Sequence, residues 1–382
     1  MRDGGGQEAR RLPDVEATAD GDRADARSLK RVGPPGFRPA WWLPGRHLQT
    51  VWGHFARARQ LVAFRREWLA TPDGDEIALD HVHIASPDGG PSPDGFDALA
   101  PAPRTRPRLL VLHGLEGSSF SVYVQGLLAL AAERGWDGVV LNFRSCARDP
   151  SAVDRWLANR APRLYHSGET RDLDLVAREL RRRDPERPLL AVGISLGGNV
   201  LLKWLGEHPR QRVIDAAATI SVPYDLAAGA RNLDCRIGRI YARHFLPTLA
   251  DKVEDLVGRF PELLARGVDL RAARAARDFR RFDDAATAPI HGFTGADDYY
   301  ARSSALRYAA RVDTPTFCLS AVDDPFLPHS ALDAFREAAS PAIDLVVTPR
   351  GGHVGFVTGW RPARVAYWAE QLAIDWLRRQ LD

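Results

Sequence analysis

Short apolar runs alternate with longer amphipathic stretches through the middle of the chain. The apolar runs fall at 108–114, 137–143, 188–194 and 215–222. Between them, apolar residues recur at helical spacing over 122–135, 167–183 and 197–208. Unbroken Val, Leu and Ile runs are typical of strands buried on both faces, and their alternation with helices is typical of βαβ units. The pattern predicts an α/β protein with a mostly parallel central sheet.

The chain before this region has four parts. Residues 1–36 are polar and rich in Gly, Asp, Arg and Ala, which predicts a disordered tail. The aromatic-rich segment 37–55 is expected to pack against the body of the protein. In residues 66–84, apolar and polar positions alternate on both sides of a Pro-Asp-Gly-Asp turn, which predicts two strands. The Pro/Gly-rich stretch 85–107 predicts an exposed loop.

The alternation stops between Pro223 and Pro315, where the pattern is mostly helical. This stretch reads as an insertion into the strand series. The series then resumes with a strand at 314–322, a helix at 328–340, a last strand and loop at 342–353, and a closing amphipathic helix at 362–381. We therefore expect one α/β domain over 37–382 with a helical insertion at about 223–315.

Composition excludes several classes of protein. Apolar residues make up 45% of the 382 residues, enough for a sizeable core, and the net charge is only +3. Acidic residues interrupt the basic segments, which favours solvated helix faces and predicts no nucleic-acid partner. No run approaches the roughly 20 apolar residues of a membrane span, so any membrane contact would be peripheral. The oligomeric state is left open.

The cysteines and the first residues favour a cytoplasmic protein. Cys146, Cys235 and Cys318 are far apart and odd in number, which favours reduced thiols over a disulfide framework. The first residues are polar and lack the apolar core of a signal peptide.

One turn carries the strongest chemical signal. Residues 193–197 read Gly-Ile-Ser-Leu-Gly between a predicted strand and a predicted helix, which fits the G-x-S-x-G elbow that presents a nucleophilic serine. Ser195 is therefore a candidate nucleophile. A plain glycine-rich connection is the simpler alternative. A phosphate-binding loop is not favoured, because it needs a Lys before the helix that this turn does not supply.

A nucleophilic serine needs a base and an acid, which follow it in the order Ser, Asp or Glu, His in this kind of sheet. Asp323 and Asp324 follow the strand at 314–322, and His353 lies in a glycine-flanked loop after the last strand. His353 is the expected base. The spacing to Pro328 favours Asp324 as the acid, and Asp323 would then face a turn amide or solvent.

The oxyanion needs preorganised backbone N–H groups. The N–H of Leu196, directly after the serine, is one candidate. The other is the N–H of Leu115, where Gly114 allows a sharp turn. His113 has no nearby ligand partner in the sequence, so we expect it to brace this loop rather than to bind a metal.

Several motifs in order resemble one known group of proteins. These motifs are AWWLPGRHLQTVW, LHGLEGSS, YHSGETRDL, GISLGGNVLLKWLGE, ATAPIHGFTGADDYY, AVDDPFLP and GGHVGF. From Phe37 to its end, the chain resembles the α/β-hydrolase superfamily, specifically its YheT-like branch with EMB8-like and abhydrolase-domain lipases. The resemblance implies helices on both faces of the sheet and a helical cap over the site. It also implies Ser195 as nucleophile, His353 as base and an aspartate from Asp323-Asp324.

The expected activity is hydrolysis of carboxylic esters, short-chain, medium-chain or lipid, without metal or organic cofactor. Acyl transfer by the same residues and a non-catalytic binding role are the alternatives. Two further features have two interpretations each. Tyr299 and Tyr300 line an acyl pocket or, as we favour, pack the cap on the core. The segment 46–50 contributes polar groups near the pocket or anchors the N-terminal segment.

Overall fold

The structure is a computed structural model that describes residues 36–57, 62–82, 106–235, 238–362 and 364–382. The disordered tail expected over 1–36 lies outside these ranges except for Gly36. The exposed loop expected over 85–107 lies outside them except for its last two residues.

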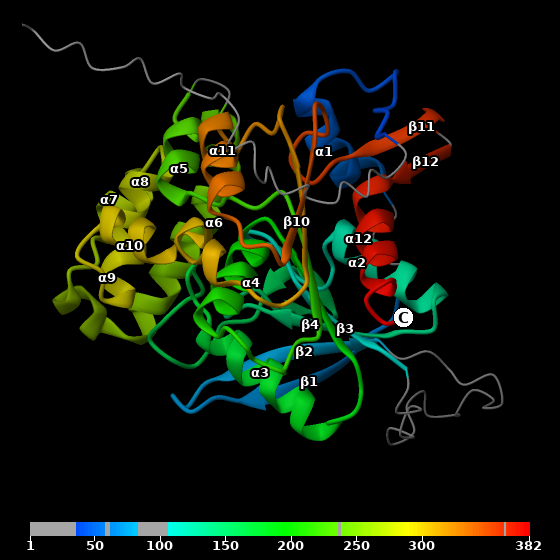
Figure 1. Ribbon diagram of the computed structural model, residues 1–382. Coiled ribbons are helices and arrows are strands. Elements are labelled where there is room, and N and C mark those ends of the chain that lie inside the picture. The colour runs from blue at the N-terminus through cyan, green and yellow to red at the C-terminus, as the bar shows by residue number, and fades with distance from the viewer. Residues whose placement is uncertain (1–35, 58–61, 83–105, 236–237, 363) are drawn as a thin grey trace, which may run out of the picture.

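An eight-stranded sheet forms the centre of the molecule (Figure 1). Its order is β1-β2-β4-β3-β7-β8-β9-β10. The strands are β1 (Arg65–Ala70), β2 (Glu76–Val82), β3 (Arg108–Leu112), β4 (Asp137–Asn142), β7 (Leu189–Ile194), β8 (Ala216–Ile220), β9 (Thr316–Ala321) and β10 (Ile343–Thr348). Every neighbouring pair from β4 to β10 is parallel, and β2 runs against both β1 and β4. The predicted α/β class with a mostly parallel sheet is confirmed.

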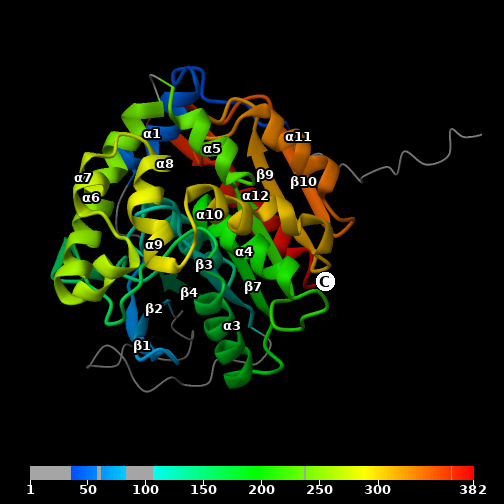
Figure 2. The same ribbon diagram turned by 90° about the vertical axis from the view of Figure 1, so that its left-hand side faces the viewer.

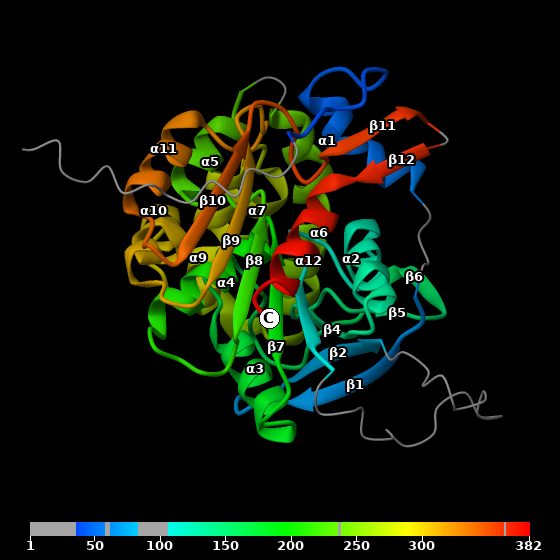
Figure 3. The same ribbon diagram turned by 45° about the vertical axis from the view of Figure 1, so that its right-hand side comes forward.

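Helices cover both faces of the sheet, as Figure 3 shows. Successive strand residues point to opposite faces. On β3, Val111 joins the cluster that contains α2 and α12, whereas Leu110 joins the cluster that contains α3 and α4. The helices that flank the sheet are α2 (Val122–Glu133), α12 (Trp368–Arg378), α3 (Arg171–Arg183), α4 (Leu196–Glu207) and α11 (His329–Ala338). The continuous apolar runs of the strands follow from this two-sided burial.

The described chain between β8 and β9 is mostly helical, with short turns between the helices. Its elements are α5 (Leu226–Leu233), α6 (Gly238–Arg259), η1 (Pro261–Arg266), α7 (Leu270–Ala275), α8 (Phe279–Phe282), η2 (Asp283–Thr287), α9 (Ala288–His291), α10 (Ala296–Ser303) and η3 (Ala305–Arg311). Figure 2 shows these helices grouped together in front of the sheet. Asn199 on α4 anchors the end of this helical stretch. Its Nδ2 donates to the Ser303 carbonyl and its Oδ1 accepts the Ala305 N–H, each at 2.8 Å.

The N-terminal segment packs on the body of the protein, as expected. The ring of Phe37 lies 5.1 Å from that of Trp368, and the Trp42 indole donates to the Gly359 carbonyl at 3.1 Å. Helix α1 (Arg46–Ala56) follows, and its buried Gln49 accepts the Val357 N–H at 2.8 Å. Residues 46–50 therefore anchor the segment, which is one of the two interpretations of this stretch.

The prediction of one helix over 362–381 is wrong in its first part. Residues 364–367 form β12 (Arg364–Tyr367), which pairs antiparallel with β11 (Val357–Arg361), and the helix α12 begins only at Trp368. Val365 and Tyr367 are residues that favour strands, and the partner strand supplies the ladder that the helical periodicity could not reveal. A second short hairpin, β5 (Arg148–Asp149) and β6 (Ala152–Trp156), was also not predicted.

The three cysteines are free thiols; Cys146 and Cys318 are buried and Cys235 is exposed. Among the described helices, none combines the length and the apolar character that crossing a membrane would need.

Candidate active site

Ser195 lies at the tip of a tight turn between β7 and α4. Its backbone has φ 51° and ψ −116°, a conformation that non-glycine residues rarely adopt. The Ser195 N–H donates to the Ile220 carbonyl at 2.9 Å, which attaches the turn to β8. A Cβ on Gly193 would lie 2.6 Å from the Gly197 oxygen, and one on Gly197 would lie 2.5 Å from the Leu112 oxygen. Glycine at both positions therefore allows the strained turn.

Gly198 lies where α4 closely approaches the chain after β8. A Cβ there would lie 2.5 Å from Cγ2 of Val222 and 3.0 Å from the Gly193 oxygen. We expect Gly198→Val to lower the free energy of unfolding by about 1–3 kcal/mol through overpacking, and to lower esterase activity by displacing the turn. Urea unfolding measures the first effect. Gly258→Val is the matched control, because a Cβ added at that helical position would meet no neighbouring atom within 4 Å. Equal stability of the two variants would contradict the close-approach role of Gly198.

The structure brings Ser195, His353 and Asp324 together in one chain of hydrogen bonds. Nε2 of His353 lies 2.9 Å from Oγ of Ser195, and Nδ1 of His353 lies 2.9 Å from Oδ2 of Asp324. Asp324 is 1% exposed, and its Oδ1 also accepts the Phe326 N–H at 2.8 Å. Asp323 lies elsewhere: its Oδ1 accepts the Gly352 N–H at 2.9 Å, so of the two expected surroundings, a turn amide or solvent, it has the turn amide.

The loop that carries His353 is held from three sides. The His353 N–H donates to Oγ1 of Thr50 at 2.9 Å, and the Val354 N–H donates to Oγ of Ser221 at 3.0 Å. The ring of Phe326 stacks on the imidazole, with the two ring centroids 4.1 Å apart. Thr50 therefore places a polar group of segment 46–50 next to the site, which is the other interpretation of this segment. Sequence reasoning missed these contacts.

The loop after β3 lies next to Ser195, because a Cβ on Gly114 would lie 3.4 Å from the Cβ of Ser195. The Gly114 N–H donates to the Tyr123 hydroxyl and the Glu116 N–H to the Tyr165 hydroxyl, both at 2.9 Å. Between them, the Leu115 N–H makes no hydrogen bond to another described residue, and Leu115 lines the cavity next to Ser195. Leu196 lines the same cavity from the first turn of α4, where N–H groups lack helical partners.

His113 braces this loop. Its Nδ1–H donates to the Gly114 carbonyl at 2.8 Å, and its Nε2 accepts the Phe143 N–H at 3.1 Å. Complete burial lowers the pKa of His113 to about 3, so the imidazole is neutral. The described residues contain no group of three or more His, Cys, Asp or Glu side chains that could hold a metal ion.

A buried ion pair ties the same loop to the helical insertion. Lys252 on α6 is fully buried, and its Nζ lies 2.7 Å from Oε1 of Glu116. The Tyr165 hydroxyl donates to the same carboxylate at 2.8 Å. Glu116 itself has a positive φ of 56°. The sequence offers no signal for this pair, because the two residues are 136 positions apart.

Lys252→Met is expected to lower the free energy of unfolding by about 3–5 kcal/mol, because it leaves the Glu116 carboxylate buried and unpaired. Denaturant unfolding followed by circular dichroism measures the change. Arg274→Met is the control, since Arg274 pairs with Asp251 and Glu254 at the surface and its loss should cost less than about 1 kcal/mol. Equal losses in the two variants would show that the Lys252 pair contributes no more than a surface pair.

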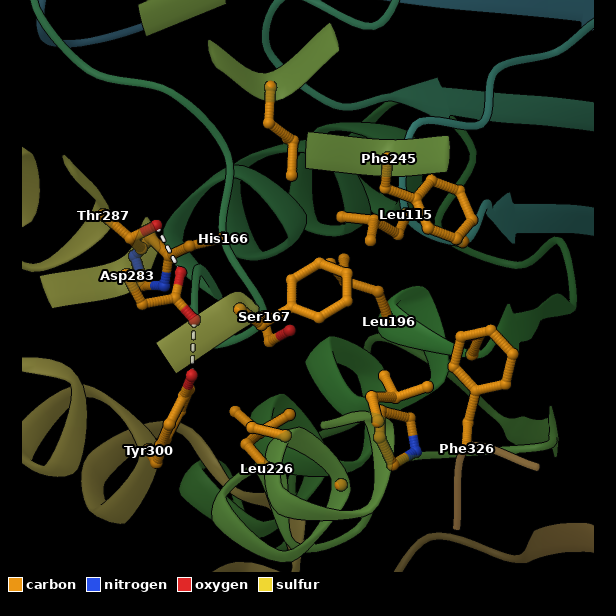
Figure 4. Close-up of a pocket in the computed structure, with 18 of the residues that line it drawn as sticks. Leu115, His166, Ser167, Leu196, Leu226, Phe245, Asp283, Thr287, Tyr300 and Phe326 are labelled. Atoms are coloured by element: carbon orange, nitrogen blue, oxygen red, sulfur yellow. Dashed lines mark hydrogen bonds between the residues drawn. The ribbon is translucent and has the colours of Figure 1, made fainter. Parts of the chain in front are cut away.

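A cavity of about 230 Å³ opens at Ser195 and His353 and extends under the insertion. Most of its lining is apolar, including Leu196, Leu226 and Phe245 (Figure 4). Tyr299 and Tyr300 also line it, and at the same time they pack with Leu226 in a small buried cluster. The tyrosine pair thus packs within the insertion and also lines the cavity.

The sequence is similar to one protein family and to several characterised proteins. The model of the family described as "alpha/beta hydrolase fold" matches residues 107–359. YheT of Escherichia coli (strain K12), named as a candidate esterase, is 35% identical over 88% of this chain and 91% of its own. The human phospholipase ABHD3 is 31% identical over 87% of this chain and 76% of its own. The monoacylglycerol lipase of Saccharomyces cerevisiae (strain ATCC 204508 / S288c) is 27% identical over 81% of this chain and 74% of its own.

A solved structure shows the same fold. The Pyrococcus furiosus esterase Pf2001 has a TM-score of 0.50, with 14% identity over 84% of this chain and 92% of its own.

Proposed function

Because the chain belongs to the α/β-hydrolase family, in its YheT-like branch, we propose that it is a serine hydrolase that cleaves carboxylic esters. One observation carries the proposal. Oγ of Ser195 and Nε2 of His353 are 2.9 Å apart, and Nδ1 of His353 is 2.9 Å from the buried carboxylate of Asp324. A nucleophile, a base and an orienting acid thus form one chain of hydrogen bonds, and the nucleophile and the base line an apolar cavity.

In the first half-reaction, Nε2 of His353 accepts the Ser195 proton while Oγ attacks the ester carbonyl carbon. Asp324 accepts the hydrogen bond of Nδ1–H, which keeps the other nitrogen free to act as base. The N–H groups of Leu115 and Leu196 stabilise the oxyanion of the tetrahedral intermediate. The intermediate collapses, His353 returns the proton to the departing alkoxide, and the acyl group stays on Ser195.

In the second half-reaction, His353 removes a proton from water, whose oxygen attacks the acyl carbonyl. The same N–H groups stabilise the second oxyanion. Collapse breaks the bond to Oγ, His353 returns the proton to Ser195, and the free acid leaves. Each step uses protein groups and water.

We propose that the insertion at about 223–315 is a cap that shapes the substrate cavity. Leu226 on α5, Phe245 and Leu249 on α6, and Phe282 on α8 all line the cavity. An apolar cavity of this kind suits the hydrocarbon part of a small-molecule or lipid ester. Exposed Trp41 and Phe55 suit peripheral contact with a lipid surface.

Hydrolysis of p-nitrophenyl esters of increasing acyl length tests the proposal. We expect turnover of the series with a maximum at the length that fills the cavity. No turnover at any length by folded protein would contradict it. Product analysis in added methanol separates release of the acid from acyl transfer to the alcohol, since both reactions use the same residues.

A further inference from the structure

The cavity ends in a polar group of side chains that the proposed mechanism does not use. Figure 4 shows Asp283, Thr287, His166 and Tyr300 together at one end, and Phe326, which stacks on His353, at the other. Asp283 accepts hydrogen bonds from Oγ1 of Thr287 at 2.6 Å and from the Tyr300 hydroxyl at 2.7 Å.

The Asp283 carboxyl is buried without a cation. Throughout the described part of the chain, no Lys, Arg or His side chain forms an ion pair with it. Burial raises its pKa to about 7. The neighbouring imidazoles do not supply the charge, because burial lowers the pKa of His166 well below its usual value and that of His291 to about 3. Burying the ionised form without a cation is costly, and the partners that the described residues give this carboxyl are two hydroxyl groups rather than a charge.

The local backbone indicates a built site. Residues Asp283–Thr287 form a single turn of π-helix, a rare conformation that occurs frequently at functional sites. The turn carries both Asp283 and its partner Thr287, whereas Tyr300 comes from α10. Each carboxylate oxygen accepts one hydroxyl and retains a second lone pair, and Asp283 lines the cavity. The group is therefore equipped to accept a hydrogen bond from a ligand.

The surroundings define what such a ligand would carry. Leu115, Leu196, Leu226 and Phe245 lie between the two ends of the cavity in Figure 4. Phe279, Phe282 and Tyr299 also line it. A molecule that fills this space needs an apolar middle and, at the Asp283 end, a group that donates hydrogen bonds.

We propose that Asp283, Thr287 and Tyr300 form a subsite for a hydroxyl or ammonium group at the end of an ester farthest from its reacting carbonyl. This proposal rests on the proposed function, because it places the carbonyl of that ester at Ser195. The preferred substrates are then esters with a polar terminus rather than plain alkyl esters.

Binding to the Ser195→Ala protein tests the subsite independently of hydrolysis. Isothermal titration calorimetry compares ethyl esters of straight-chain acids that end in methyl, hydroxyl or ammonium, in matched sets of several lengths. At the length that spans the cavity, we expect a donor-ended ester to bind at least about tenfold more tightly than its methyl-ended match, the effect of one hydrogen bond to a charged group. The arm that binds more tightly identifies the donor.

Two second substitutions complete the test. Adding Asp283→Asn, which keeps partners for Thr287 and Tyr300, should abolish the preference. Adding Asp284→Asn, which alters the neighbouring exposed carboxylate, should preserve it. Equal Kd values at every length, no binding of any ester, or a preference that survives Asp283→Asn would overturn the subsite. A preference in the Ser195→Ala protein, combined with folded wild-type protein that hydrolyses none of these esters, would instead contradict the proposed function and leave the subsite standing.

Discussion

Replacing Ser195 by alanine is expected to lower kcat/KM for p-nitrophenyl esters by on the order of 10³-fold or more. The hydroxyl removed is the atom that would carry the acyl group, and Nε2 of His353 at 2.9 Å would lose its proton donor. The loss should be confined to chemistry, because alanine keeps the Cβ of the turn and the Ser195 N–H bond to Ile220 is a backbone contact. Initial rates at several ester concentrations measure the change.

The matched control is Ser151→Ala, which removes an exposed hydroxyl in the β5–β6 hairpin and should leave the rate within about twofold. Circular dichroism and the Tm show whether both proteins are folded. Full activity in folded Ser195→Ala protein would remove Ser195 as the nucleophile.

Asp324→Asn is expected to lower kcat by on the order of 10³–10⁴-fold, whereas Asp323→Asn should lower it by less than about tenfold. The two residues are adjacent, but only Asp324 faces the imidazole, with both carboxylate oxygens within 3.1 Å of Nδ1. An asparagine there can turn its amide N–H toward Nδ1, which makes Nδ1 an acceptor and moves the ring proton to Nε2. The imidazole then cannot accept the Ser195 proton.

Asp323 acts on a different group, because its carboxylate accepts the Gly352 N–H next to His353. An asparagine oxygen can accept the same bond, so the loop should keep its place. Parallel measurement of kcat and Tm for both variants separates chemistry from stability. A larger loss for Asp323→Asn would assign the acid to Asp323 and contradict the geometric assignment.

The sequence predicted the parts of the molecule that depend on local patterns. Buried strands such as Leu189–Ile194 are unbroken apolar runs, so their position and the mostly parallel sheet followed from the pattern. The elbow at Ser195 has its own spacing of small residues, the chain order pointed to His353 and to the pair Asp323-Asp324, and the spacing to Pro328 favoured Asp324. In each case the determining residues are near each other in sequence or follow a known order.

The missed features depend on contacts between distant residues. Thr50 holds the His353 backbone across 303 positions, and Lys252 reaches Glu116 across 136. Neither contact produces a periodic pattern of apolar and polar residues in the sequence. The helix expected over 362–381 failed for a related reason, since strand β12 exists only because β11 pairs with it. The polar end of the cavity could not be predicted from the sequence, because Asp283 appears there as one more charged residue in a helical stretch.

The claim that Ser195 carries an activated nucleophile is tested most directly by reaction with a fluorophosphonate. Oγ displaces fluoride from phosphorus, and intact-mass measurement followed by peptide mapping locates the adduct. We predict one adduct per chain on Ser195, and no adduct on Ser195→Ala or on protein unfolded in urea, where His353 no longer faces the hydroxyl. A folded wild-type protein that stays unlabelled, or that carries the adduct on another residue, would contradict the claim.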